Sequence, residues 1–120
     1  NIKLKKSGDL NTNVLKNVIE KKFEVKFSKE PNISVINLSE AAELTFENIL
    51  EGKYEGPRPN NSPLYYLSDE EIKLYAKLKN IKGKERNPHK KVRELFAKFK
   101  EKNPDLEQNI VKALAQIQDN

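Results

Sequence analysis

Residues 1–36 read NIKLKKSGDLNTNVLKNVIEKKFEVKFSKEPNISVI, and in them short alternating segments lie on either side of one helical segment. Apolar and charged residues alternate over residues 2–5 and 23–27, and an apolar run follows at 33–36. Between the first two, residues 14–19 place apolar side chains at helical spacing. The order predicts an α/β fold with a small, mainly parallel three-stranded sheet. The short link before the third strand leaves an antiparallel hairpin open there.

The rest of the chain is predicted to be helical and to cover the sheet. One helix is expected from Ser39 to Glu51, with Gly52 ending it. Residues 52–63 hold three prolines and two glycines and predict a loop. Ser68 and Glu71 form a capping-box pattern, and a helical C-terminal part extends over residues 68–118. The 120 residues are expected to form a single domain, although the last three helices could also make a bundle of their own.

Composition excludes several classes of chemistry. The chain has no cysteine and one histidine, which argues against disulfides, thiolate or multi-histidine metal sites and a cysteine nucleophile. No metal site is therefore expected. No apolar run is long enough for a membrane span. These features predict a cytoplasmic protein without a membrane partner; they leave its oligomeric state open.

The positive charge is concentrated in one segment. The net charge is +5, and residues 82–102 alone hold nine basic and three acidic side chains, a local charge of +6. Such a segment can contact several phosphates of RNA. We therefore assign RNA binding to Lys84, Arg86, Lys90, Lys91 and Arg93, together with Arg58 in the proline-rich loop. The alternative is that these side chains only form the solvated faces of residues 82–86 and of the helix that follows them.

The turn Ser7-Gly8-Asp9 is the candidate nucleotide site. It lies between the first predicted strand and the first predicted helix, where backbone N–H groups can bind phosphate. One glycine makes a poor phosphate cradle, and no Walker or Rossmann spacing surrounds it. The alternative is an ordinary turn in which Asp9 or Asn11 caps the helix.

Three segments resemble one known family. They are NLSEAAELTFENILEGKY (37–54), SPLYYLSDEEIKLYAKLKNI (62–81) and VRELFAKFKEKNPDLEQNIVKALAQI (92–117). In this order they resemble the helix after the ATP-binding strand, the Pro-Leu-aromatic segment and the closing helices of PP-loop ATPases that thiolate tRNA. The resemblance implies a PP-loop-like α/β domain with ATP as cofactor and tRNA as substrate.

The chain differs from that family in the motifs that carry the family's catalytic chemistry. The family's Ser-Gly-Gly-x-Asp-Ser loop is represented only by Ser7, Gly8 and Asp9, and its aspartate after Asn-Leu is replaced by Ser39. The family's metal-binding or reactive cysteines are missing. We therefore expect a catalytically inactive relative that needs no cofactor and binds RNA, such as tRNA, or a partner in tRNA modification. The alternatives are an ATP-dependent adenylating or thiolating subunit and a protein-interaction module.

Overall fold

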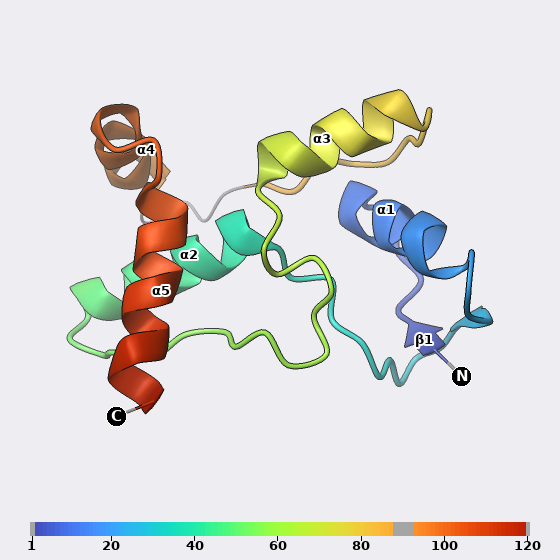
Figure 1. Ribbon diagram of the computed structural model, residues 1–120, viewed down its shortest axis with the longest axis horizontal. Coiled ribbons are helices and arrows are strands. Elements are labelled where there is room, and N and C mark those ends of the chain that lie inside the picture. Colours follow the sequence, from blue (N-terminus) through green and yellow to red (C-terminus); the bar gives the residue numbers. More distant parts are fainter. Residues whose placement is uncertain (1, 88–92, 120) are drawn as a thin grey trace. The chain divides into compact units, whose positions relative to one another are not determined.

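The computed structural model describes residues 2–87 and 93–119 and divides into two compact units (Figure 1). Unit 1 comprises Asn1–Asn37 and Pro59–Arg86, and unit 2 comprises Leu38–Arg58 and Asn87–Asn120. The proline-rich segment 52–63 contains no helix or strand, as predicted, and contributes to both units. The single-domain organisation stays a prediction.

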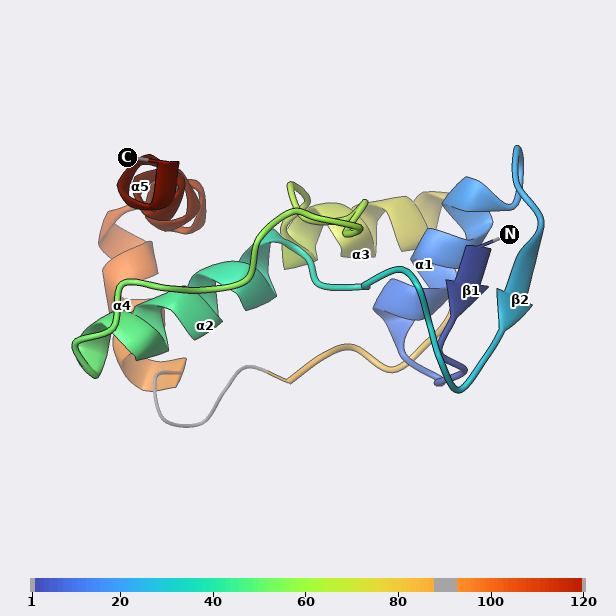
Figure 2. The ribbon, with the colours of Figure 1, turned by 90° about the horizontal axis from the view of Figure 1, so that it is seen from below.

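Unit 1 contains a strand–helix–strand unit with a two-stranded parallel sheet. Strand β1 (Ile2–Leu4) leads into helix α1 (Leu10–Ile19), and strand β2 (Val25–Phe27) returns beside β1. Ile2 is in register with Val25. Figure 2 shows the two strands side by side. The helix and the parallel pairing agree with the alternation of the sequence.

The prediction of a three-stranded sheet is wrong, because residues 33–36 form no strand. The Ser34 N–H donates to the carbonyl of Asn61 at 2.7 Å, and the Ile36 N–H donates to Ser34 Oγ at 3.2 Å. The Val35 carbonyl accepts from Asn11 Nδ2 at 3.3 Å. Backbone groups that would bond to a neighbouring strand thus form hydrogen bonds with a loop carbonyl and with side chains instead. The apolar run is a packed, extended connection, and its side chains still contact the core.

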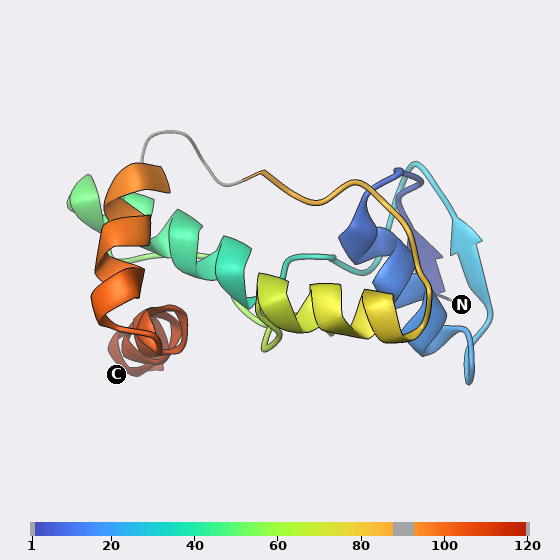
Figure 3. The same ribbon diagram turned by 90° about the horizontal axis from the view of Figure 1, so that it is seen from above.

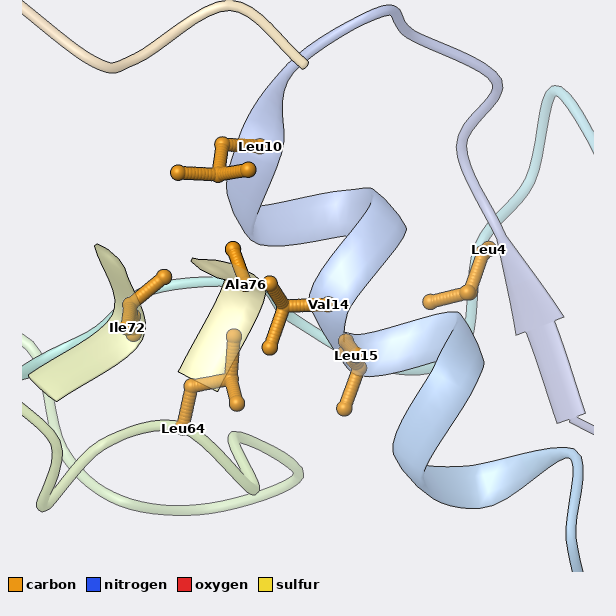
Figure 4. Packing of buried hydrophobic residues seen from close by; sticks show 7 residues of the cluster. All are labelled: Leu4, Leu10, Val14, Leu15, Leu64, Ile72 and Ala76. Atoms are coloured by element: carbon orange, nitrogen blue, oxygen red, sulfur yellow. The ribbon is translucent and has the colours of Figure 1, made fainter. Parts of the chain in front are cut away.

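The core of unit 1 lies between α1, α3 (Asp69–Leu78) and β1 (Figure 4). Its buried members are all apolar: Leu4, Leu10, Val14, Leu15, Leu64, Ile72 and Ala76. Ser68 and Glu71 form the predicted capping box at the start of α3. Tyr65 is buried, whereas its neighbour Tyr66 is exposed. Tyr65 therefore anchors the segment before α3.

Unit 2 is built from three helices: α2 (Leu38–Leu50), α4 (Arg93–Lys102) and α5 (Leu106–Asp119). Phe46 of α2 contacts the rings of Phe96 and Phe99 of α4 edge to face, at centroid distances of 5.4 and 5.8 Å. Helix α5 crosses α2 and buries Val111 and Leu114 (Figure 1). Gly52 has a φ of 82° just after α2, which is the predicted left-handed helix end. In the described residues, no helix has the length and apolar character needed to cross a membrane.

Candidate functional site

The predicted nucleotide turn is a capped helix start. The Asp9 carboxylate accepts from the Thr12 N–H at 3.2 Å and from the Thr12 hydroxyl at 2.6 Å. Ser7 Oγ accepts from the Asp9 N–H at 3.2 Å. Asp9 is thus the N-cap of α1, one of the two capping residues that the sequence offered. A cap of this kind places a carboxylate where a phosphate would have to sit.

Residues 82–86, which follow α3 and are called the connector here, lie against the same turn. The Lys84 N–H donates to the Gly8 carbonyl at 2.9 Å, and the Leu10 N–H donates to the Lys84 carbonyl at 2.8 Å. These bonds make Asp9 and Lys84 an isolated parallel bridge. Asn13 Nδ2 adds a bond to the Lys82 carbonyl at 2.7 Å. Figure 3 shows the connector running back past α1. The structure therefore joins two segments that the sequence marked as separate sites.

Gly83 allows this close approach. A Cβ at position 83 would lie 2.8 Å from the Leu10 Cα and 2.9 Å from the Leu10 nitrogen. A Cβ at Gly8 would meet no atom within 4 Å. The glycine that the contact requires is thus Gly83, which sequence reasoning missed, and not the glycine of the predicted phosphate turn.

Four lysines are exposed on the two joined segments. Lys5 and Lys6 follow β1, and Lys82 and Lys84 belong to the connector. The backbone bonds between residues 8–10 and residue 84 hold these segments side by side. We call these four residues the lysine surface. Only Lys84 of this group was predicted as an RNA contact.

An open hollow of about 770 Å³ adjoins the turn. Its walls come from the end of β1, the start of α1 and the extended connection, and comprise Lys5, Ser7, Asp9, Thr12, Pro31, Asn32, Ile33, Ser34, Val35 and Asn61. Asn61 has a φ of 54°, a left-handed conformation that asparagine tolerates better than most residues. Ligands of parallel α/β sheets bind beyond the carboxyl ends of the strands, which is where this hollow lies.

Arg86 makes a two-pronged ion pair. Its Nε lies 2.9 Å from Asp69 Oδ1, and its Nη2 lies 2.8 Å from Asp69 Oδ2. Asn37 Nδ2 also donates to Asp69 Oδ1, at 2.8 Å. The Arg86 side chain is only 13 % exposed. This geometry is that of a structural contact that ties the connector to α3. The positions of Asn37, Asp69 and Arg86 in the sequence did not indicate that these side chains would meet.

Lys73 pairs with Glu85 on the same connector. Lys73 Nζ lies 2.9 Å from Glu85 Oε1, with both side chains more than half exposed. The hydrogen bond to Glu85 raises the pKa of Lys73 above its usual 10.5. The connector is therefore held to α3 by two ion pairs and to α1 by backbone bonds.

Of the other predicted RNA contacts, the structure describes Arg58 and Arg93, and both belong to unit 2. Arg58 is half-buried at the end of the unit 2 loop segment. Lys90 and Lys91 lie outside the described residues, and Arg93 is the first residue of α4. In α4, Lys100 Nζ contacts Glu107 of α5 at 3.2 Å. The basic segment 82–102 is thus shared between the two units.

Comparison with protein-family models, curated proteins and solved structures finds no match to this chain. The resemblance to PP-loop ATPases accordingly stays a prediction. Within the described ranges, no cluster of three or more His, Asp or Glu side chains could hold a metal ion.

Proposed function

We propose that this chain is a non-catalytic RNA-binding protein and that the lysine surface of unit 1 contacts the phosphate backbone. The observation that carries the proposal is the pairing of Asp9 with Lys84, which joins the turn that follows Lys5 and Lys6 to the segment that carries Lys82 and Lys84. Lysine side chains on long stems act as point charges that can follow an irregular phosphate path. The four positive charges lie on two backbone segments that are hydrogen-bonded to each other, and charges of one sign grouped in this way attract a polyanion.

The polar network around the turn favours binding over catalysis. Phosphoryl or adenylyl transfer needs donors that are preorganised around the phosphates. Here the Leu10 N–H is bonded to the Lys84 carbonyl, and the Thr12 N–H is bonded to the Asp9 carboxylate. The carboxylate of Asp9 would in addition repel a phosphate at the start of α1. RNA contact through the lysine side chains needs none of these backbone donors.

A second candidate is nucleotide binding in the hollow. The observation that favours it is the position of the hollow beyond β1, with Lys5 and Ser7 in its wall. In this case the base and ribose would occupy the hollow, and Lys5 would meet the phosphates. The chain would then be an ATP-dependent subunit in RNA modification, as the resemblance to PP-loop ATPases implied.

The test of RNA binding is a salt titration with tRNA, the RNA that the resemblance suggests. Lys5, Lys6, Lys82 and Lys84 are changed together to glutamine. We expect weaker binding and a salt slope, log K against log salt, that is smaller by about 0.7–0.9 for each lost phosphate contact. A matched control changes four exposed lysines elsewhere, Lys21, Lys22, Lys53 and Lys112.

The controls separate the candidates. If the two quadruple variants lose affinity equally, net charge alone accounts for binding and the lysine surface is not the site. A third variant, Lys90→Gln with Lys91→Gln and Arg93→Gln, tests the residues assigned from sequence. Calorimetry with ATP and magnesium tests the second candidate. Submillimolar binding that is lost in Gly8→Val would favour a nucleotide site over a purely RNA-binding role.

A further inference from the structure

The outer edge of β2 is open in unit 1. The Ile2 N–H donates to the Glu24 carbonyl at 3.2 Å, and the Ser28 N–H donates to the Leu4 carbonyl at 2.8 Å. Glu24 and Ser28 therefore turn backbone groups toward β1. Since strand residues alternate, the N–H and C=O groups of Val25 and Phe27 point to the other edge. Within the described residues, β1 is the only strand paired with β2 (Figure 2).

The corresponding edge of β1 is closed, which makes the two edges unlike. The Lys3 N–H donates to Asn32 Oδ1 at 2.8 Å, and the Asn32 N–H donates to the Lys3 carbonyl at 3.1 Å. Asn32 thus replaces a neighbouring strand at that edge. Natural proteins commonly block open edges because an open edge can pair with another chain. The unblocked edge of β2 is where such pairing can occur.

The sequence around β2 is complementary to itself. Residues 23–27 read Phe-Glu-Val-Lys-Phe, so reversing the direction about Val25 exchanges Glu24 with Lys26. In an antiparallel pair of two copies centred on Val25, each Glu24 would face Lys26 of the other copy. Each Phe23 would face a Phe27. Opposite charges and aromatic pairs directly across from each other stabilise strand pairing.

The charged and aromatic side chains needed for this pairing are exposed, and Lys16 Nζ lies 5.6 Å from the ring centroid of Phe27. Phe23 and Phe27 are 58 % and 44 % exposed, although both are large apolar residues. Glu24 and Lys26 are also exposed, and their nearest charged atoms lie 3.6 Å apart within one chain. A like-charged segment would repel its own copy, whereas residues 23–27 carry one charge of each sign. A second copy of the chain is therefore the occupant that its charges fit.

We propose that two copies of this chain dimerise through antiparallel β2–β2 pairing centred on Val25. The dimer is two-fold symmetric, since the same residues contribute from each copy. It joins the two sheets in the order β1-β2-β2-β1. The Val25 N–H and C=O of each copy bond those of the other, and each Phe27 N–H bonds a Phe23 carbonyl. Pairing of this kind uses main-chain bonds for affinity and side chains for register.

The test uses charge reversal and sedimentation equilibrium of the full chain. Glu24→Lys places lysine against lysine, and Lys26→Glu places glutamate against glutamate. We expect each variant to dimerise about tenfold or more weakly than the native chain, because two cross-strand pairs change from attraction to repulsion. Mixing the two variants should restore dimers, since both cross-strand pairs of the mixed dimer then join a lysine of one variant to a glutamate of the other. The double variant Glu24→Lys with Lys26→Glu should also dimerise like the native chain.

Circular dichroism checks that every variant is folded, which is expected because both side chains are exposed. A native chain that stays monomeric up to about 1 mM would overturn the proposal. So would single variants that dimerise as well as the native chain. Both single variants could also dimerise weakly without recovering when they are mixed. That result would exclude the Val25-centred register and with it the proposed interface.

Discussion

The guanidinium of Arg86 and the carboxylate of Asp69 form two parallel contacts, at 2.9 and 2.8 Å, with the carboxylate at the first residue of α3. Asp69 therefore has two roles. It complements the positive end of the helix dipole, as any acid in the first turn does. It also pairs with an arginine 17 residues later, and so fixes the connector whose other end lies on α1.

Replacing Asp69 with alanine should destabilise unit 1. The change leaves the largely buried Arg86 guanidinium without its carboxylate, and we expect the free energy of unfolding to fall by about 1–3 kcal/mol. Glu70→Ala is the comparison variant, because Glu70 is a more exposed acid in the same helix turn, and we expect it to lose less stability, about 0.3–1 kcal/mol. Urea denaturation of the three proteins measures both changes. Equal losses would mean that the ion pair contributes nothing beyond the helix dipole.

Gly83→Ala should loosen the connector from α1. The new Cβ would lie 2.8 Å from the Leu10 Cα, so backbone must shift, and we expect a loss of about 1–3 kcal/mol. Gly8→Ala, where the Cβ meets open space, should be neutral or stabilise by up to about 1 kcal/mol. Hydrogen exchange at the Leu10 and Lys84 amides gives a local readout. Unchanged protection in Gly83→Ala would contradict the close approach.

Two buried threonines should respond oppositely to valine. Thr45 in α2 is fully buried, and among the described residues its hydroxyl has no hydrogen-bond partner. Thr45→Val should be neutral or raise the stability by about 1 kcal/mol, because it removes an unsatisfied polar group. The hydroxyl of Thr12 in α1 donates a hydrogen bond to the Asp9 carboxylate, so Thr12→Val should lower the free energy of unfolding by about 1–3 kcal/mol. The unfolding midpoints of both variants, measured by thermal denaturation, test these two expectations. A lower midpoint for Thr45→Val would show that the Thr45 hydroxyl has a hydrogen-bond partner.

The Lys73–Glu85 ion pair should stabilise the fold up to alkaline pH. Its pairing raises the pKa of Lys73, so the contribution is present below the usual value of 10.5 and is lost as the pH rises through the raised value. Both side chains are more than half exposed, and the effect should stay below about 1 kcal/mol. Glu85→Gln should therefore lower the unfolding midpoint slightly at neutral pH. Above the raised pKa, native and variant midpoints should converge, and a constant difference would assign the effect to something else.

Local signals were sufficient for most of the secondary structure. Asp9 and Ser68 start helices where their sequence patterns predicted, because a capping side chain bonds N–H groups only two or three residues away. Gly52 ends α2 for a similarly local reason, the left-handed conformation that glycine adopts freely. The parallel pairing of β1 and β2 followed from the intervening helix.

The tertiary structure decided what depends on partners distant in the sequence. Residues 33–36 have the composition of a strand, but Ser34 bonds to Asn61, 27 positions away, and so no third strand forms. Arg86, which stays a predicted RNA contact, pairs with Asp69, 17 positions away, a contact that no local pattern indicated. The candidate site likewise exists because Lys84 reaches the turn at Gly8, a contact that Gly83 permits. The sequence by itself determined the helices, their caps and the concentration of charge, since these depend on neighbours along the chain. Only the folded chain decided which backbone groups would pair across long separations, because each such pairing depends on the packing of the whole unit.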